Sequence, residues 1–60
     1  MKEFDMVIYR FDDSVDYDFM RATSIDKVVT RAKEIIHQED EILHILVREV
    51  DGTDTQLVYF

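Results

Sequence analysis

The chain has 60 residues, with no cysteine and no proline, and its 14 acidic against 7 basic residues give a formal net charge of −7. A chain this short folds as one small domain that buries roughly 60% of its unfolded surface, so residues 1–60 are interpreted as a single domain. The missing cysteines exclude disulfides and a thiolate zinc site. The charge and the absence of a long apolar run disfavour nucleic acid and membranes as partners, and we expect a cytoplasmic protein.

Residues 3–20 have the alternating pattern of two β-strands joined by a turn. Phe4, Met6 and Ile8 alternate with Val7, Tyr9 and Phe11, and a second alternation runs from Val15 to Met20. The polar residues 12–14 predict the turn. A two-residue loop at 13–14 sets Ile8 opposite Phe19. This register places six side chains on one face: Phe4, Met6, Ile8, Val15, Tyr17 and Phe19.

An amphipathic helix is predicted to follow, ending at residues 37–40. Ser24 or Thr23 is suited to the N-cap, and Asp26 suits the positive end of the helix dipole. Apolar residues recur every three or four positions and form one stripe: Ile25, Val28, Val29, Ala32, Ile35 and Ile36.

Residues 42–50 and 56–60 predict two further strands, joined by a hairpin at Asp51-Gly52, where a tight turn needs positive φ. The loop is either the two residues 51–52 or the four residues 51–54. A two-residue loop sets Glu49 opposite Asp54, a like-charge pair, and a four-residue loop avoids it. In both cases the apolar residues expected to face the helix are Leu43, Ile45, Val47, Val58 and Phe60.

These elements predict an α+β fold with the order ββαββ. The expected architecture is a four-stranded, mainly antiparallel sheet in the order 2-1-3-4, with one helix packed on one face. The alternative is the order 1-2-3-4, in which the second and third strands pair in parallel.

One helix covers only one face of such a sheet, yet the second face also holds apolar side chains. Its expected members are Val7, Tyr9, Phe11, Met20, Ile42, Leu46, Leu57 and Tyr59. An apolar patch on a soluble monomer marks an interface, and Val7, Met20, Leu46 and Tyr59 are the predicted dimer or partner interface. Alternatively, the sheet curls and draws some of these side chains into the core.

The first hairpin carries a run of carboxylates interleaved with aromatic side chains. Asp12, Asp13, Asp16 and Asp18, together with Tyr9 and Phe11, are the predicted partner-binding residues. Carboxylates two residues apart on a strand are about 7 Å apart and imitate successive phosphates, so the segment is suited to the groove of a nucleic-acid-binding protein. The alternative interpretation is a solvated turn.

A calcium site in the same segment is rejected. Asp12, Ser14 and Asp16 alternate as the first ligands of an EF-hand loop do. However, Tyr17 stands where that loop needs glycine, and Thr23 stands where it needs glutamate.

Catalysis is not expected either. His37 at the helix end and His44 in the third predicted strand belong to no catalytic grouping, and one glycine cannot form a phosphate-binding loop. We also expect a chain of this size to have no room for a pocket of about 300 Å³ or more lined by its own residues. The prediction is therefore a non-enzyme without cofactor or metal.

The stretch Ala22-Thr23-Ser24-Ile25-Asp26, leading from a strand into an amphipathic helix, resembles the layout of several small bacteriophage proteins, among them an inhibitor of host RNA polymerase. The resemblance covers about twenty residues and assigns no family. The predicted function is a small acidic inhibitor or adaptor, of phage or mobile-element type, that docks on a basic protein surface. The alternative is a structural homodimer or an accessory subunit that assembles through the uncovered sheet face.

Overall fold

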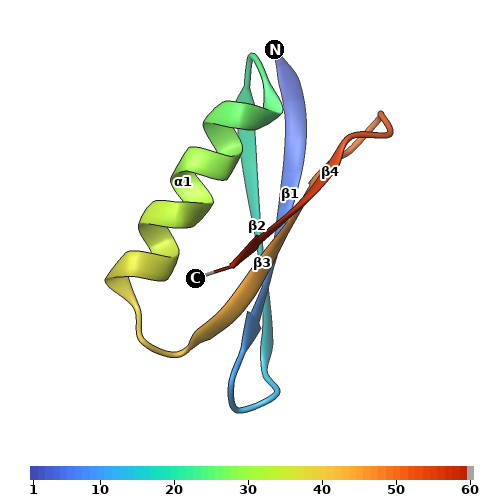
Figure 1. Cartoon of the computed structure of the whole chain (residues 1–60). Helices are drawn as coiled ribbons and strands as arrows, with labels where there is room; N and C mark the ends of the chain where they lie inside the picture. Colours follow the sequence, from blue (N-terminus) through green and yellow to red (C-terminus); the bar gives the residue numbers. More distant parts are fainter. Residues whose placement is uncertain (60) are drawn as a thin grey trace.

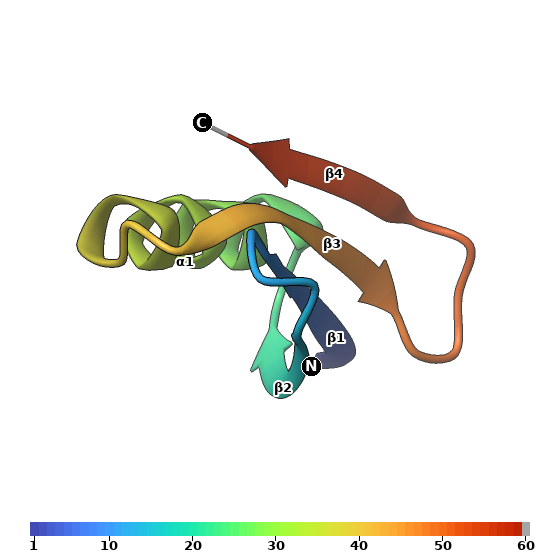
Figure 2. The ribbon, with the colours of Figure 1, turned by 90° about the horizontal axis from the view of Figure 1, so that it is seen from below.

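The computed structural model describes residues 1–59, which form four strands and one helix in the predicted order ββαββ. These are β1 (Lys2–Arg10), β2 (Val15–Ala22), α1 (Ile25–Gln38), β3 (Ile42–Glu49) and β4 (Thr55–Tyr59). All strand pairs are antiparallel and the sheet order is β2-β1-β3-β4, with α1 against one face (Figures 1 and 2). The α+β prediction and its strand order are confirmed, and the parallel alternative is wrong. Phe60 lies outside the described residues.

The first hairpin has a three-residue loop in place of the predicted two-residue loop. The Arg10 N–H donates to the Ser14 carbonyl over 3.0 Å, and the Asp13 N–H donates to the Arg10 carbonyl over 3.1 Å. Asp13 has a φ of 69°. A type I turn followed by a left-handed residue is a common three-residue hairpin connection. Aspartate tolerates that conformation better than most residues, which explains its place here.

This loop changes the register of β2 and turns its side chains over. Ile8 lies opposite Asp16, so the predicted Ile8–Phe19 pair is wrong. Because the shift is an odd number of residues, it exchanges the two faces of the strand. Three predicted core side chains therefore lie on the uncovered face: Val15, Tyr17 and Phe19. Met20, predicted on the uncovered face, lies opposite Phe4 and packs against the core.

A second irregularity separates the predicted from the observed facing of β3. Tyr9 lies opposite His44, but Arg10 lies opposite Ile42, so Leu43 is an extra residue in β3. Such a bulge reverses the alternation at the start of the strand. Ile42 is buried in the core and Leu43 is exposed, and the predicted facing of both residues is wrong.

The second hairpin has a loop over residues 50–53 that keeps the like-charge pair. Glu49 donates its N–H to the Asp54 carbonyl over 2.9 Å, so the register is the one expected for the two-residue loop, with Glu49 opposite Asp54. Lys2 Nζ lies 3.6 Å from Oε1 of Glu49 and offsets the repulsion. Gly52 has no positive φ, so the predicted primed turn is wrong. A Cβ at position 52 would overlap the Glu49 carboxylate as it lies, and that flexible side chain would have to move.

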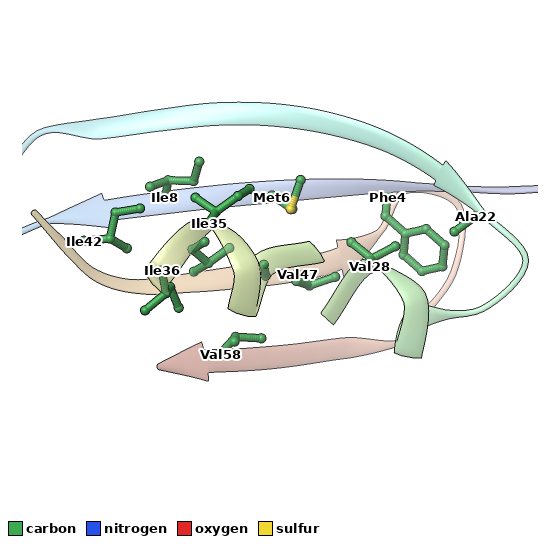
Figure 3. Close-up of a cluster of buried hydrophobic side chains, with 12 residues drawn as sticks. Phe4, Met6, Ile8, Ala22, Val28, Ile35, Ile36, Ile42, Val47 and Val58 are labelled. Carbon is green, nitrogen blue, oxygen red and sulfur yellow. The ribbon is translucent and has the colours of Figure 1, made fainter. Parts of the chain in front are cut away.

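The helix buries its apolar stripe against the sheet, as predicted (Figure 3). Ser24 is the N-cap by its extended backbone, without a side-chain cap bond, and Asp26 lies in the first turn. The core cluster joins residues of all five elements: Phe4, Met6, Ile8, Ala22, Val28, Ala32, Ile35, Ile36, Ile42, Ile45, Val47 and Val58. Over residues 1–59, no helix is both long and apolar enough to cross a membrane.

Replacing Phe4 and Phe19 separately by alanine tests the register of β2. Phe4 is 0% exposed and Phe19 is 52% exposed. Phe4→Ala leaves a cavity in the core and should cost about 3–5 kcal/mol, as much as a core of this size supplies. Phe19→Ala should cost about 1 kcal/mol or less.

Urea unfolding followed by circular dichroism measures both changes in the free energy of unfolding. Equal losses for the two variants would contradict the observed register, because the two-residue turn would have placed both rings in the core.

Candidate functional site

The face of the sheet turned away from α1, called the open face below, carries apolar side chains aligned across all four strands. One cross-strand row runs through Val15, Tyr9, His44 and Tyr59. The next row runs through Tyr17, Val7, Leu46 and Leu57. Side chains aligned in this way stand side by side on one surface of the sheet.

Side chains at the centre of the open face pack against one another, whereas those on its two edge strands are exposed. The Tyr9 and His44 rings lie with their centroids 4.6 Å apart and their planes tilted by 41°. Val7 is buried although it lies on this face, because larger cross-strand neighbours flank it. Tyr17 is 74% exposed and Tyr59 67% exposed, at opposite edges of the sheet. Large apolar side chains in such positions suit a protein interface better than solvent.

Near the N-terminal end of β1 the open face becomes polar. Arg48 Nη2 lies 3.7 Å from Oδ2 of Asp5, and Arg21 Nη2 lies 3.6 Å from Oε1 of Glu3. These cross-strand ion pairs border the apolar rows, and each of them joins one positive and one negative side chain.

Two segments far apart in the chain meet at the end of the molecule that holds the first hairpin loop. Together they form what we call the acidic end. The first is residues 12–18, with Asp12, Asp13, Asp16 and Asp18, and the second is residues 39–41, between α1 and β3, with Glu39, Asp40 and Glu41. A backbone hydrogen bond of 2.9 Å from the Phe11 N–H to the Glu41 carbonyl connects the two segments. These seven acids and Arg10 leave a formal charge of −6, against −7 for the whole chain.

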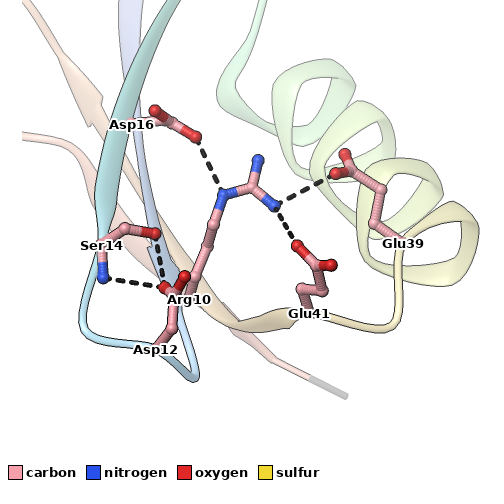
Figure 4. Close-up of polar contacts among 6 residues, drawn as sticks. All are labelled: Arg10, Asp12, Ser14, Asp16, Glu39 and Glu41. Carbon is pink, nitrogen blue, oxygen red and sulfur yellow. Dashed lines mark hydrogen bonds and ion pairs between the residues drawn. The ribbon is translucent and has the colours of Figure 1, made fainter.

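Arg10 holds the acidic end together (Figure 4). Its Nε lies 2.9 Å from Oδ2 of Asp16 in β2. Its Nη1 lies 3.1 Å from Oε1 of Glu39 and 3.7 Å from Oε2 of Glu41. Hydrogen bonds to Asp16 and Glu39 raise the pKa of the guanidinium above its ordinary value. One cation therefore ties the first hairpin to the segment that follows the helix.

Asp12 is fixed within its own loop. The Ser14 hydroxyl donates to Oδ1 of Asp12 over 2.6 Å, and the Ser14 N–H donates to the same oxygen over 3.0 Å. These bonds, the hydroxyl first, lower the pKa of the Asp12 carboxyl below its ordinary value because they favour the charged form. The carboxylate thus keeps its charge further into the acidic range than an unbonded aspartate.

An open groove of about 440 Å³ lies between the hairpin loop and the end of the helix. Its lining combines apolar and acidic side chains: Phe11, Ile36, His37, Glu39, Asp40, Ile42 and Leu43. The expectation that the chain has no room for a hollow of this size is wrong.

The structure separates the predicted interface residues. Tyr9, Val7, Leu46 and Tyr59 lie on the open face, whereas Met20 lies on the helix side and Phe11 in the hairpin loop. Sequence reasoning missed the open-face positions of Tyr17 and Phe19 and the contribution of residues 39–41. The predicted order ββαββ already places the helix end beside the first hairpin, so the position of the acidic residues 39–41 could have been predicted from the sequence.

Among residues 1–59, no group of three or more His, Cys, Asp or Glu side chains is arranged to hold a metal ion. The chain matches no protein-family model, no curated protein and no solved structure.

Replacing Arg10 by glutamine should destabilise the fold at low salt, because three carboxylates then repel one another without a cation between them. Added salt should narrow the gap to the parent chain, since it screens that repulsion. Urea midpoints at several salt concentrations measure the effect. The control is Arg31→Gln, which removes one helix-surface pair with Glu34 and should change little. A deficit for Arg10→Gln that does not depend on salt would contradict this role.

Proposed function

We propose that this chain is a small, non-catalytic protein-binding module, an inhibitor or adaptor that docks on a basic protein surface through its acidic end and the adjoining open face. The observation that carries the proposal is the segregation of charge, with −6 of the −7 gathered in residues 10–18 and 39–41. Charge gathered at one end draws a partner of opposite sign to that end.

Exposed aromatic side chains beside the acids support the same proposal. Phe11, next to the acidic end, is 67% exposed, and Tyr17 lies on the open face between Asp16 and Asp18 along β2. Interfaces obtain most of their affinity from a few aromatic anchors, while charges around them set the partner and the orientation.

A protein surface that binds nucleic acid is the partner type that best suits this arrangement. Such surfaces carry Lys and Arg for phosphate contacts together with apolar or stacking positions for bases. The acidic end would occupy that surface as a nucleic-acid mimic. Inhibitors of this kind are encoded by phages and other mobile elements, in keeping with the resemblance noted in the sequence.

Neutralising loop acids tests the proposal. The variant Asp13→Asn, Asp40→Asn, Glu41→Gln removes three charges from the acidic end. A matched control, Glu34→Gln, Asp51→Asn, Asp54→Asn, removes the same charge elsewhere. Affinity capture at low and high salt identifies the protein bound by the parent chain, and titration with the purified partner then measures each dissociation constant.

We expect binding that weakens with salt and that falls about tenfold in the acidic-end variant, at about 0.5 kcal/mol per exposed charge. The control should bind as the parent chain does. Equal weakening of the two variants would show that only net charge matters, and would count against docking through the acidic end.

A second candidate function is self-association through the open face. It is favoured by the exposure of Tyr17, Phe19, Leu57 and Tyr59, which lie on one surface. Packing two such faces together would bury both cross-strand rows, each of which spans all four strands.

Sedimentation analysis separates the two functions. If the open face forms a dimer, the parent chain sediments at twice its 7.2 kDa mass and Tyr17→Ser with Leu57→Ser returns it to a monomer. Asp26→Asn on the helix serves as the control and leaves the mass unchanged. A parent chain that stays monomeric at high concentration contradicts self-association.

A further inference from the structure

The edge of the sheet formed by β2 is available for pairing with another strand. β2 is the outermost strand of the order β2-β1-β3-β4. The Arg10 N–H donates to Ser14 O, which makes this a hydrogen-bonded pair. Because such pairs alternate along an antiparallel ladder, the backbone groups of Val15, Tyr17 and Phe19 point outward, away from β1. Outward backbone groups of this kind are a template for a further strand.

The side chains of β2 alternate strictly in chemistry along this edge. Asp16 and Asp18 lie on the helix side, opposite Ile8 and Met6 of β1. On the open face lie Val15, Tyr17 and Phe19, all of them exposed. A strand added beside β2 would therefore meet carboxylates with every second residue and apolar or aromatic side chains with the residues between.

The two carboxylates remain accessible because α1 diverges from β2 toward the C-terminal end of the helix (Figure 1). Asp16 and Asp18 are exposed although they lie on the helix side of the sheet. Asp18 also accepts a hydrogen bond of 2.8 Å from the Phe19 N–H, one of the outward groups. A strand that takes over this N–H would free the Asp18 carboxylate for a cation.

We propose that β2 binds an antiparallel partner strand in which Lys or Arg alternates with apolar residues. The inference rests on the proposed function and specifies its mode, which is strand addition at the sheet edge. The basic residues of the partner face Asp16 and Asp18, and its apolar residues continue the open face beside Tyr17 and Phe19.

Charge argues against a second copy of this chain as the occupant. Each copy carries −7, and self-pairing of β2 would set the Asp16 and Asp18 of both copies on the same face of the joined sheet. Like charges at neighbouring cross-strand positions are destabilising. The same acids that favour a basic strand therefore disfavour self-pairing.

Peptides with capped ends test the pairing. The first is a peptide of about eight residues, a common strand length, that alternates Val with Lys. The second has the same composition with the Lys residues in one block. Two further peptides are N-methylated on the backbone, one at its Val residues and one at its Lys residues.

In the antiparallel arrangement the N–H groups of the Val residues face β2, and those of the Lys residues face solvent. We expect the alternating peptide to bind and Lys methylation to be tolerated. Val methylation and the block sequence should each weaken binding more than about tenfold, because they remove several hydrogen bonds or the matched alternation. Equal affinity of all four peptides, or a loss on Lys methylation alone, would overturn the proposal.

Charge reversal at one position complements the peptides. Asp18→Lys should weaken binding of the Val–Lys peptide at least about fivefold and should strengthen binding of a Val–Glu peptide. Asp54→Lys makes the same change in net charge away from β2 and should affect neither peptide selectively. Identical behaviour of the two variants would overturn the proposal, and circular dichroism verifies that both are folded.

These results are separable from the test of the proposed function. If the natural partner depends on the loop acids but the peptides show no dependence on alternation, strand addition fails and docking through the acidic end stands. If the alternating peptide binds as expected while the loop acids are dispensable for the partner, β2 alone carries the interaction.

Discussion

The three-residue turn between β1 and β2 determines what each side of this molecule presents. Asp13 adopts a left-handed backbone there, and the closing bond from Arg10 to Ser14 sets the pairing of every residue along β2. Aromatic side chains consequently stand on the open face and carboxylates on the helix side. A turn one residue shorter would exchange the two sides, and the aromatic rows of the open face would lose their outermost members.

The architecture was predictable and the facing of the edge strand was not. Alternating apolar residues identify strands and a three- and four-residue repeat identifies the helix, so composition and pattern lead to ββαββ in the order 2-1-3-4. Phe19 is as apolar as Phe4, and nothing in the pattern of Tyr17 and Phe19 says which side of the sheet they occupy. That depends on turn length, and on the bulge at Leu43 for β3. A one-residue difference in a loop has a small local free energy and reverses a whole strand.

The candidate surface was predicted in part for a related reason. The acids of the first hairpin stand out in the sequence, but their relation to Glu39 and Glu41 arises only when antiparallel strands bring two distant segments to one end. Arg10 then becomes the shared partner of both segments. Its position in the chain gives no sign of this, because its three carboxylate partners lie 6 to 31 residues away.

The concentration of charge at one end also gives the molecule a direction in an electric field. Nearly all of the net charge lies at the acidic end, so the charge distribution of the chain is strongly asymmetric. A positively charged surface would turn the molecule during approach, so that productive orientations are over-represented among encounters. Such steering acts on the association rate constant more than on the lifetime of the complex. Speed of capture is thus a property that this small fold obtains from the placement of its charges.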